Sequence, residues 1–449
     1  MSGIAELLAN LGYDVSGSDA RRSGVTARLE TLGVRVFIGH DRANVGPTDV
    51  VVVSSAIARD NEEVVEAQRR RVPVIPRAEM LAELMRLRYG IAIAGAHGKT
   101  TTTSMVALVL DRAGLDPTAV IGGRLSAFGS NARLGKGDYM VVEADESDRS
   151  FLKLSPAIAV ITNIDREHME SYGTWDNLQQ AFAEFANKVP FYGAVIACAD
   201  DQPVARLLPR LTRRVITYAL DAAADVRGQG VQLHAFGSTC TVVRTRAEGP
   251  AEELGRLHLR VPGRHNVLNA LAATAAAVEV GVPFTRIAAA LEEFRGAERR
   301  FETRGEVAGV MVVDDYGHHP TEIAAVLAAA RAGIDRRIIA VFQPHRYSRT
   351  SQLLDEFGAA FRGADLIVLT DIYAAGEPPI AGITVEALAE AVRRSVPVPV
   401  QIVSRLDDVP AAVAALARSG DLVLTLGAGS IGVVADRILD ALRQKGAGA

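Results

Sequence analysis

The residues with the clearest chemistry form one continuous run, Gly95-Ala96-His97-Gly98-Lys99-Thr100-Thr101-Thr102-Thr103. The run follows an apolar segment at residues 91–94, and Met105, Leu108 and Val109 behind it would share one face of a helix. Glycines allow backbone N–H groups to converge on phosphate oxygens, and the N-terminus of a helix attracts anions. The order of strand, glycine turn and helix predicts a phosphate-binding loop. The alternative is a glycine turn that happens to precede a lysine.

Two side chains of this loop have expected roles. Lys99 would reach the β- and γ-phosphates of a bound nucleotide, and the hydroxyl of Thr100 would ligate Mg²⁺. The two glycines are closer together than in the common G-x4-G-K-[ST] pattern, so a search for that pattern would miss the loop. By itself the loop is compatible with a kinase, a motor, a GTPase or a ligase.

Acidic residues follow an apolar segment at residues 139–142, in the run Glu143-Ala144-Asp145-Glu146-Ser147-Asp148. In phosphate-loop enzymes a carboxylate at the end of a strand meets the metal. Glu143 comes directly after the apolar residues and is therefore the predicted ligand. Asp145 and Glu146 are expected in a loop, with solvated or structural roles. The alternative for the whole group is an ordinary acidic turn.

A histidine follows the next apolar segment, residues 157–161, in the run Thr162-Asn163-Ile164-Asp165-Arg166-Glu167-His168-Met169. A histidine after a buried strand is more often a packed or solvated side chain than a metal ligand. Beside a phosphate loop and a strand-end carboxylate, however, His168 becomes a candidate ligand of a second Mg²⁺. Two metal ions suit a reaction that holds both an ATP phosphate and an acyl phosphate.

The elements that would position these residues alternate between helix and strand. Residues 4–11 predict a helix, and extended segments follow at 13–16, 34–38, 50–53 and 72–75, which is typical of a doubly wound α/β domain. Such a domain normally opens with a strand and a glycine-rich turn. The chain instead begins at the helix, so we expect a truncated or mis-assigned start. The strands at 13–16 and 50–53 would then flank a gap of roughly 10 Å or have collapsed together.

Two further units follow along the chain. The second has predicted strands at 91–94, 139–142, 158–161, 194–197 and 215–218, then hairpins over 226–261 and a helix at 266–279. The third begins near Phe301, with strands at 310–313, 338–342, 366–369, 400–403 and 422–426. At 449 residues the chain exceeds one hydrophobic core, so two or three domains are expected.

Composition excludes several classes of protein. The net charge of -4 argues against a surface that coats nucleic acid, and no basic, aromatic-laced patch suggests a nucleic-acid motor. The only cysteines, Cys198 and Cys240, have no metal-like spacing and fit a reducing compartment. The N-terminus does not look like a signal peptide, and the apolar stretch at 267–282 is too short to span a membrane. We therefore expect a cytoplasmic protein without nucleic-acid or membrane partners.

Taken together, these motifs resemble the Mur ligase family, over essentially all of the chain. Ala96 stands where the family usually has Thr, a change that spares the glycines and Lys99. Besides the runs given above, the resemblance rests on Ser54-Ser55-Ala56-Ile57, Pro262-Gly263-Arg264-His265-Asn266-Val267-Leu268-Asn269-Ala270, Arg299-Arg300-Phe301-Glu302, Asp314-Asp315-Tyr316-Gly317-His318-His319-Pro320, Phe342-Gln343-Pro344-His345-Arg346-Tyr347-Ser348-Arg349-Thr350 and Leu426-Gly427-Ala428-Gly429-Ser430-Ile431.

The resemblance implies an α/β fold with three domains. A truncated Rossmann-like UDP-binding domain would cover residues 1–89, a central P-loop ATPase domain 90–296, and a Rossmann-like C-terminal domain 297–449. Within the family, the motifs at 314–319 and 342–348 resemble the alanine-adding type. That likeness implies ATP-dependent joining of L-alanine to UDP-N-acetylmuramate through an acyl phosphate, in peptidoglycan precursor synthesis, with ATP and Mg²⁺ as cofactors. A monomer or homodimer is expected.

The family pattern also assigns roles to residues. Mg²⁺ would be held by Thr100, Glu143 and His168. The substrates would contact His40, Ser54, Tyr316, Arg346 and Arg349. Catalysis would use Lys99, His318, His345 and Arg349. ATP would contact Gly95, Ala96, His97, Gly98, Lys99, Thr100, Thr101, His265, Asn266, Asn269 and Arg300.

Three alternatives stay open. A sister ligase would add another amino acid or a peptide to the same nucleotide sugar, and a non-catalytic nucleotide or UDP-sugar sensor would explain the short N-terminus. His318 and His319 could simply pack at a helix start before Pro320. Either His318 or His345 could be the base that deprotonates the amine, and the sequence does not decide between them.

Overall fold

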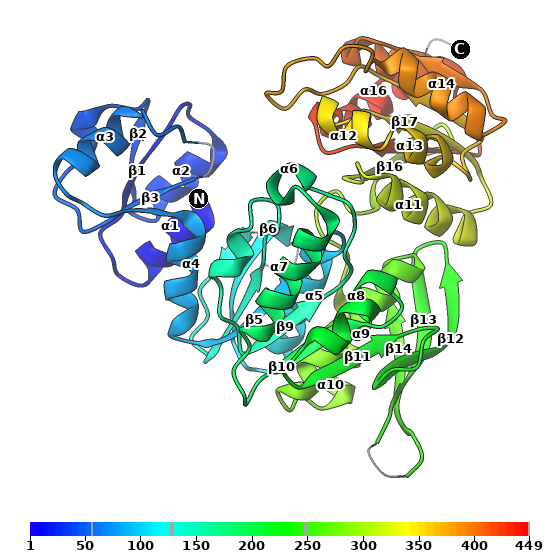
Figure 1. Cartoon of the computed structure of the whole chain (residues 1–449). Helices are drawn as coiled ribbons and strands as arrows, with labels where there is room; N and C mark the ends of the chain where they lie inside the picture. Colours follow the sequence, from blue (N-terminus) through cyan, green and yellow to red (C-terminus); the bar gives the residue numbers. More distant parts are fainter. Residues whose placement is uncertain (55–56, 126–129, 247–248, 448–449) are drawn as a thin grey trace. The chain divides into compact units, whose positions relative to one another are not determined.

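A computed structural model describes residues 1–54, 57–125, 130–246 and 249–447 (Figure 1). Ser55 and Ala56 of the predicted substrate motif lie outside the described residues. The chain divides into two compact units, which are described separately. The first comprises Met1–Gly228, Val242–Gly255 and Leu268–Leu291; the second comprises Gln229–Thr241, Arg256–Val267 and Glu292–Ala449. Within the described ranges, no helix has the length and apolarity needed to cross a membrane.

The N-terminal part of the first unit contains two separate two-stranded sheets. β1 pairs with β2 and β3 pairs with β4, both in parallel, so β1 and β3 have not collapsed into one sheet. The elements are α1 (Ser2–Asn10), β1 (Ser16–Asp19), α2 (Gly24–Thr31), β2 (Arg35–Ile38), η1 (Arg42–Asn44), β3 (Val51–Val53), α3 (Glu62–Arg69), β4 (Val74–Pro76) and α4 (Arg77–Arg86).

The first strand lies later than the predicted segment 13–16. The backbone N–H of Gly12 donates to the carbonyl of Ala9, and that of Tyr13 donates to the carbonyl of Leu8. Residues 12 and 13 are therefore bound to the end of α1, and extended structure begins only at Ser16.

The phosphate-loop run belongs to a large, mainly parallel sheet. Its strand order is β14-β13-β12-β11-β10-β9-β5-β8-β6-β7, with β7 antiparallel to β6 at one edge. The elements up to β9 are β5 (Tyr89–Ala94), α5 (Lys99–Arg112), β6 (Thr118–Leu125), β7 (Ser130–Arg133), β8 (Tyr139–Glu143), η2 (Ser150–Lys153) and β9 (Ile158–Ile161). Those that follow are α6 (Met169–Tyr172), α7 (Trp175–Asn187), β10 (Ala194–Cys198), α8 (Gln202–Leu207), η3 (Leu208–Arg210), β11 (Val215–Ala219), β12 (Val226–His234), β13 (Gly237–Arg244), β14 (Glu252–Leu259), α9 (Arg264–Glu279) and α10 (Phe284–Glu293).

This strand order decides which loops meet. β5 lies between β8 and β9 and is parallel to both. The carboxyl ends of all three strands therefore reach the same edge of the sheet, which is where open α/β sheets bind ligands. The glycine run, the Glu143 run and the His168 run follow these strands in turn. The strands β6 and β7 beside them were not predicted, because glycines and polar residues interrupt the short apolar run at 119–121.

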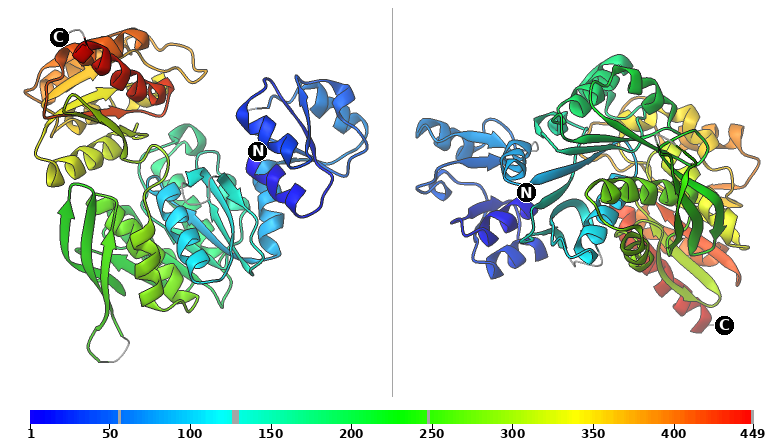
Figure 2. Two further views of the ribbon diagram at one scale, coloured as in Figure 1. Left: turned by 180° about the vertical axis from the view of Figure 1, so that it is seen from behind. Right: turned by 90° about the horizontal axis from the view of Figure 1, so that it is seen from below.

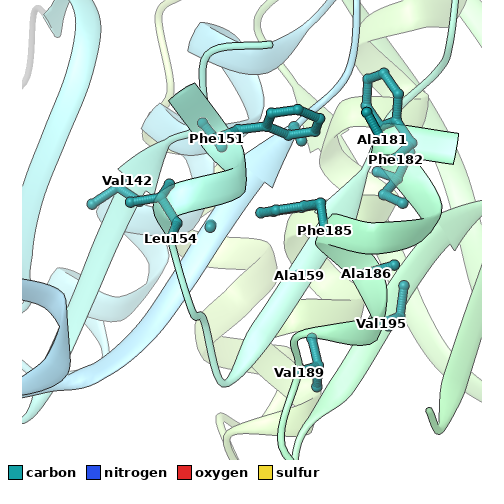
Figure 3. Close-up of a cluster of buried hydrophobic side chains, with 14 of the residues drawn as sticks. Val142, Phe151, Leu154, Ala159, Ala181, Phe182, Phe185, Ala186, Val189 and Val195 are labelled. Atoms are coloured by element: carbon teal, nitrogen blue, oxygen red, sulfur yellow. The ribbon is translucent and has the colours of Figure 1, made fainter. Parts of the chain in front are cut away.

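An aromatic cluster supports this edge from one face of the sheet (Figure 3). The ring of Phe151 lies 5.2 Å from that of Phe182 and 5.1 Å from that of Phe185, the last two on α7. All three are buried, and each buried Phe stabilises the fold by about 2 kcal/mol. Val142 and Ala159 of the sheet join the same cluster. The strand ends near the glycine run are therefore firmly packed.

The second unit contains a six-stranded sheet in the order β15-β16-β20-β17-β18-β19, parallel except for β15. One core contains side chains of α11, α13 and α14, and another contains those of α15 and α16, so helices cover both faces (Figure 2). The elements up to α14 are β15 (Glu302–Val307), β16 (Val310–Asp315), α11 (Pro320–Gly333), β17 (Arg337–Phe342), α12 (Tyr347–Gln352), α13 (Leu354–Ala360), β18 (Leu366–Leu369) and α14 (Val385–Ser395). The rest are β19 (Val400–Ile402), η4 (Leu406–Asp408), α15 (Val409–Leu416), β20 (Asp421–Leu426), η5 (Ser430–Val433) and α16 (Val434–Ala447).

Candidate active site

The two glycines of the loop have no room for a side chain. Gly95 has φ 142°, and a Cβ there would collide with the hydroxyl of Thr162. Gly98 has φ 80°, and a Cβ there would lie 2.6 Å from Oδ1 of Asn269. Only glycine adopts such conformations readily. The two closely spaced glycines therefore form a tightly packed turn. Thr162, after β9, packs against Gly95, and Asn269 of α9 packs against Gly98.

Residues 162–165, which follow β9, form hydrogen bonds with the phosphate loop. The backbone N–H of His97 donates to Oδ1 of Asn163 over 2.8 Å, and Asn163 Nδ2 donates back to the carbonyl of His97 over 2.9 Å. The hydroxyl of Thr162 donates to the same carbonyl over 2.7 Å. His97 Nε2 lies 2.9 Å from Oδ2 of Asp165. These contacts hold the loop in place, and no sequence pattern predicted that Asn163 and Asp165 would make them.

Lys99, at the first position of α5, is largely buried. Its ammonium group donates to the carbonyls of Gly95 (2.6 Å) and Ala96 (3.0 Å) and to Oε1 of Glu146 (2.9 Å). Burial lowers the pKa of Lys99, but the charges of Glu146, Glu143 and other carboxylates raise it more, so the group stays cationic. The loop therefore presents a fixed positive charge beside its own backbone.

Glu146, for which a solvated or a structural role in a loop was expected, lies in the loop after β8 and forms a buried ion pair. Its side chain is 3 % exposed and pairs with Lys99. Burial raises the pKa of Glu146 to about 7, against the opposing charge of Lys99. The backbone of Glu146 is held as well: its carbonyl accepts from the phenol of Tyr172, on α6, over 2.5 Å.

The structure brings together two predicted magnesium ligands. The hydroxyl of Thr100 donates to Oε1 of Glu143 over 3.1 Å, and Oε2 of Glu143 accepts from the backbone N–H of Gly122 over 2.7 Å. A hydroxyl and a carboxylate oxygen are the hard ligands that Mg²⁺ prefers. The donors therefore fit the ion.

The third predicted ligand, His168, lies in a different group. It has a left-handed backbone, φ 55°, at the start of α6. Its Nε2 lies 3.9 Å from Oε2 of Glu167. One ligand atom each from Glu146, Glu167 and His168 lie within 4.8 Å of one another, a separation that a metal ion can bridge. Sequence reasoning selected His168 alone, because adjacent acidic residues are too common to single out Glu167.

The ATP-binding residues predicted on α9 differ in surroundings. Asn269 lies against the loop, where its Oδ1 accepts from the hydroxyl of Thr102 over 3.2 Å. Asn266 donates to the carbonyl of Pro262 over 2.7 Å, within the first turn. Burial, together with the charge of Arg300, lowers the pKa of His265 to about 4. Arg300 Nη1 is 3.3 Å from Oε1 of Glu322.

In the second unit, a row of rings follows the ends of β16 and β17. Ring centroids are 5.5 Å apart for Tyr316 and His318, 5.7 Å for His318 and His345, and 5.5 Å for His345 and Tyr373. Burial, with the nearby positive charges, lowers the pKa of His345 to about 3. His345 is therefore neutral at physiological pH. Tyr373 was not predicted, since it follows β18 and belongs to none of the motifs.

Arg299, Arg300, Arg346 and Arg349 lie beside this row, and the rings with these four arginines are called the basic cluster. Arg349 Nη1 lies 3.1 Å from Nδ1 of His345 and 3.2 Å from its carbonyl oxygen. The guanidinium carbons of Arg299 and Arg300 lie 5.3 Å and 5.2 Å from the centre of the Tyr316 ring. Guanidinium groups bind carboxylates and phosphates well. The cluster can therefore bind an anion.

His319, in contrast, acts as a helix cap. It precedes α11, its side chain accepts from the backbone N–H of Thr321, and Glu322 completes a capping box. The packing alternative therefore describes His319, whereas the His318 ring faces Tyr316 and His345. Behind both, Asp315 accepts from the backbone N–H groups of Phe301 and Gly317, and burial raises its pKa to about 6.

The predicted sugar-nucleotide residues lie at the strand ends of the N-terminal part. His40 Nδ1 is 3.0 Å from the hydroxyl of Ser18, which donates to Oε2 of Glu63 over 2.5 Å. Burial raises the pKa of Glu63, but its hydrogen bonds with Ser18 and Asn44 outweigh this and keep it below the ordinary value. Ser54 is half-buried just after β3. His40 thus belongs to a polar network whose other members the sequence did not indicate.

The fold and these groups define a class of protein. A phosphate loop at the edge of an α/β sheet, a magnesium-type pair beside it and a separate Rossmann-like unit with a basic cluster are features of nucleotide-dependent enzymes. Three domains of one protein family match successive parts of the chain. They are the Mur ligase family catalytic domain at residues 1–89, the Mur ligase middle domain at 93–277 and the Mur ligase glutamate ligase domain at 299–429.

Curated relatives agree along nearly the whole length. The chain is 54% identical to the UDP-N-acetylmuramate--L-alanine ligase of Geotalea uraniireducens, over 99% of this chain and 96% of that one. It is 55% identical to the enzyme of the same name from Anaeromyxobacter dehalogenans, again over 99% and 96%. The chain belongs to the Mur ligase family, and it is an ATP-dependent ligase that forms amide bonds.

Solved structures show the same architecture. The UDP-N-acetylmuramate-alanine ligase of Thermotoga maritima has a TM-score of 0.81 at 28% identity, covering 99% of this chain and 97% of that one. A murein peptide ligase from Psychrobacter arcticus has a TM-score of 0.70 at 27% identity, covering 98% and 96%. The expected three-domain α/β fold is confirmed.

Proposed function

We propose that this ligase joins L-alanine to UDP-N-acetylmuramate, with ATP as the energy source and through an acyl-phosphate intermediate. The observation that carries the proposal is the 54% identity, over almost the full length, to relatives named for this reaction. The basic cluster supports it, because an amino acid brings a carboxylate that guanidinium groups bind. The reaction would supply a peptidoglycan precursor in the cytoplasm.

The phosphate loop would hold the triphosphate of ATP. Backbone N–H groups of residues 98–101, at the start of α5, would face its oxygens, and Lys99 would exchange its bonds with Glu146 and the loop carbonyls for the β- and γ-phosphates. Asn269 would support the loop from α9, whereas His265, Asn266 and Arg300 would complete the ATP site. Lys99 would stabilise the charge that develops on the phosphoryl group as the muramoyl carboxylate attacks it.

Magnesium would be held by Thr100 and Glu143 at one position and by His168 at a second, where Glu146 and Glu167 are the neighbouring carboxylates. When bound, the ions would neutralise phosphate charge. The test of fit is the chemistry of the donors: a hydroxyl and a carboxylate oxygen in contact at the end of the loop.

Arg346 and Arg349 would bind the carboxylate of L-alanine, with Tyr316 beside it. The amine must lose a proton before it attacks the acyl carbon. A base with a pKa of about 3 holds a proton too weakly for this task, which favours His318 over His345. His345, being neutral, would accept or donate a hydrogen bond that orients the amine. Phosphate then leaves from the tetrahedral intermediate.

The division into domains at residues 1–89, 90–296 and 297–449 is part of the proposal, with His40 and Ser54 as contacts of the UDP-sugar. Family matches at 1–89, 93–277 and 299–429 support it.

A phosphate-release assay with an amino-acid panel tests the function. The purified chain is mixed with Mg-ATP, UDP-N-acetylmuramate and one amino acid or peptide at a time. We expect phosphate release only when both the nucleotide sugar and L-alanine are present, with a UDP-N-acetylmuramoyl-alanine product by mass spectrometry. Preference for another amino acid or a tripeptide would identify a sister ligase, and binding without phosphate release would identify a sensor.

A further inference from the structure

The helix that carries Arg349 does not cap its own first turn. α12 has six residues and begins after Arg346, whose side chain makes no capping hydrogen bond. A helix this short is not stable in isolation, and its first backbone N–H groups need acceptors from elsewhere. The orientation of Arg349 therefore depends on the group that accepts from this turn.

That group is the carboxylate of Glu377, which lies beyond β18. The backbone N–H of Ser348 donates to Oε2 over 3.0 Å and its hydroxyl donates to Oε1 over 2.7 Å. Nη1 of Arg346 lies 3.7 Å from Oε1. Burial raises the pKa of Glu377, but the bonds from Ser348 and the charge of Arg346 outweigh it and lower the pKa overall. Glu377 is thus an ionised cap supplied by a distant loop.

The same loop fixes the chain that enters α12. The backbone N–H of Arg346 donates to the carbonyl of Tyr373, and that of Tyr373 donates to the carbonyl of Pro344, both over 2.8 Å. The Tyr373 ring stacks on His345 at an interplanar angle of 17°. On the glycine loop after β20, a Cβ at Gly429 would lie 2.7 Å from Cγ of Tyr373, so this ring also fills the space beside Gly429. Residues 373–377, called here the brace, therefore hold both segments.

The brace also maintains an uncommon backbone. Arg346 has φ 72°, a conformation that residues with a side chain rarely adopt. Such a conformation persists only where surrounding contacts determine it. Here those contacts are the Tyr373 carbonyl and the Glu377 carboxylate, one on the backbone of Arg346 and one beside its side chain.

We propose that Glu377 is a positioning residue of the basic cluster, which orients Arg346 and Arg349 toward the carboxylate of the amino-acid substrate. The inference rests on the proposed function, since it assumes that these arginines bind that carboxylate. Glu377 does not touch the substrate. A guanidinium fork binds tightly only when it is held in place beforehand, so loss of the cap should weaken binding of the amino acid more than that of the nucleotides.

The main test compares Michaelis constants of four variants. We expect E377A to raise the KM for L-alanine about tenfold, and to leave the KM values for ATP and UDP-N-acetylmuramate within about twofold of wild type. E377Q should have a smaller effect because the amide keeps one acceptor oxygen, and S348A the smallest because the backbone N–H still donates. E390Q is the matched control, since Glu390 is an exposed carboxylate paired with Arg393 on α14.

A double-mutant cycle separates positioning from general stability. If Glu377 acts through Arg346, then E377A should add little to the KM effect of R346A. Fully additive effects, or an unchanged KM for L-alanine in folded E377A, would overturn the proposal, as would equal increases in all three KM values. If E377A does not fold, the same criterion applies to the other variants: the KM for L-alanine should be highest in E377Q, lower in S348A and lowest in E390Q.

Failure of the proposed function can be distinguished from failure of this inference. Wild-type protein that releases no phosphate with L-alanine would contradict the proposed function, and KM values could then not be compared between variants. In that case, hydrogen exchange in E377A and E390Q decides. Faster exchange confined to residues 346–352 of E377A supports the brace, and unchanged exchange there overturns it.

Discussion

The phosphate loop and the basic cluster, which we propose as the two anion sites, are built in different ways. The loop is one continuous segment, residues 95–101, and its backbone is shaped by two glycines and by the run after β9. The basic cluster gathers side chains from the loops after β16, β17 and β18 and relies on Glu377 for the position of its helix. A loop built from backbone groups is visible in a short sequence, whereas a cluster built from distant side chains is not.

The largest expected effect is at the loop. K99A should reduce ligation by at least about 100-fold, because it removes the fixed cation beside the transferred phosphoryl group. The measurement is the initial rate of phosphate release at saturating substrates. K153A is the control, since Lys153 forms an exposed pair with Glu79 in the same unit. Substantial activity in K99A would remove the loop from the mechanism.

Removal of magnesium should have a comparable but reversible effect. EDTA should abolish phosphate release, and added Mg²⁺ should restore it. In E143Q, restoration should need about tenfold more Mg²⁺, because an amide oxygen is a weaker ligand than a carboxylate. E184Q, on the exposed face of α7, should titrate like wild type. An identical Mg²⁺ titration for E143Q would show that Glu143 is not a ligand.

A smaller loss is expected in the basic cluster, because several of its groups share one ligand. R349A should lower kcat/KM for L-alanine by about 10- to 100-fold, a loss of roughly 1.4 to 2.7 kcal/mol. R349K should recover only part of it, since an ammonium group does not form the two parallel bonds of a guanidinium group. R393A, at an exposed ion pair, serves as the control. If R349A equalled K99A in severity, the contrast between the two regions would not hold.

The smallest effect concerns pH. The folded protein holds His345 neutral down to a pKa of about 3, whereas an exposed histidine titrates near about 6.5. Between these values the unfolded state binds a proton that the folded state does not, so stability falls as the pH falls from about 6.5 toward 3. H345Q removes this contribution. Its melting temperature should therefore decline less between about pH 7 and pH 5 than that of wild type, whereas H234Q, at an exposed position, should follow wild type.

Most of the regular structure followed from sequence patterns. Strands that are buried on both faces, such as β9 and β18, have continuous apolar runs, and their predicted limits are those of the structure. Two edge strands escaped detection because each has a single apolar residue with a side chain longer than hydrogen: Ala132 in β7 and Val307 in β15. The limits of β1 were wrong, because hydrogen bonds to α1 extend past Gly12.

Some residues of the candidate site were predicted and others were not, because adjacent strands bring some of them together and only tertiary packing places the rest. Thr100 and Glu143 meet as expected, because two neighbouring parallel strands place their carboxyl ends at one edge. For Glu146 the sequence left a solvated and a structural role open, and the structure shows it as the buried partner of Lys99. No feature of its sequence neighbourhood distinguishes it from Asp145. The backbone carbonyl of Glu146 accepts a hydrogen bond from Tyr172 of α6, a contact between residues 26 positions apart that the fold creates.

By itself the sequence determined the α/β class, the phosphate loop and the membership of a ligase family, since these depend on residues close together in the chain or on whole-length similarity. Only the tertiary structure decided that Glu146 pairs with Lys99, that Glu146 lies close to Glu167 and His168, and that Glu377 caps α12. The physical reason is that a charge acquires its partner, and its pKa, from side chains brought near it in space. Contacts between residues tens of positions apart leave no periodic trace in the sequence.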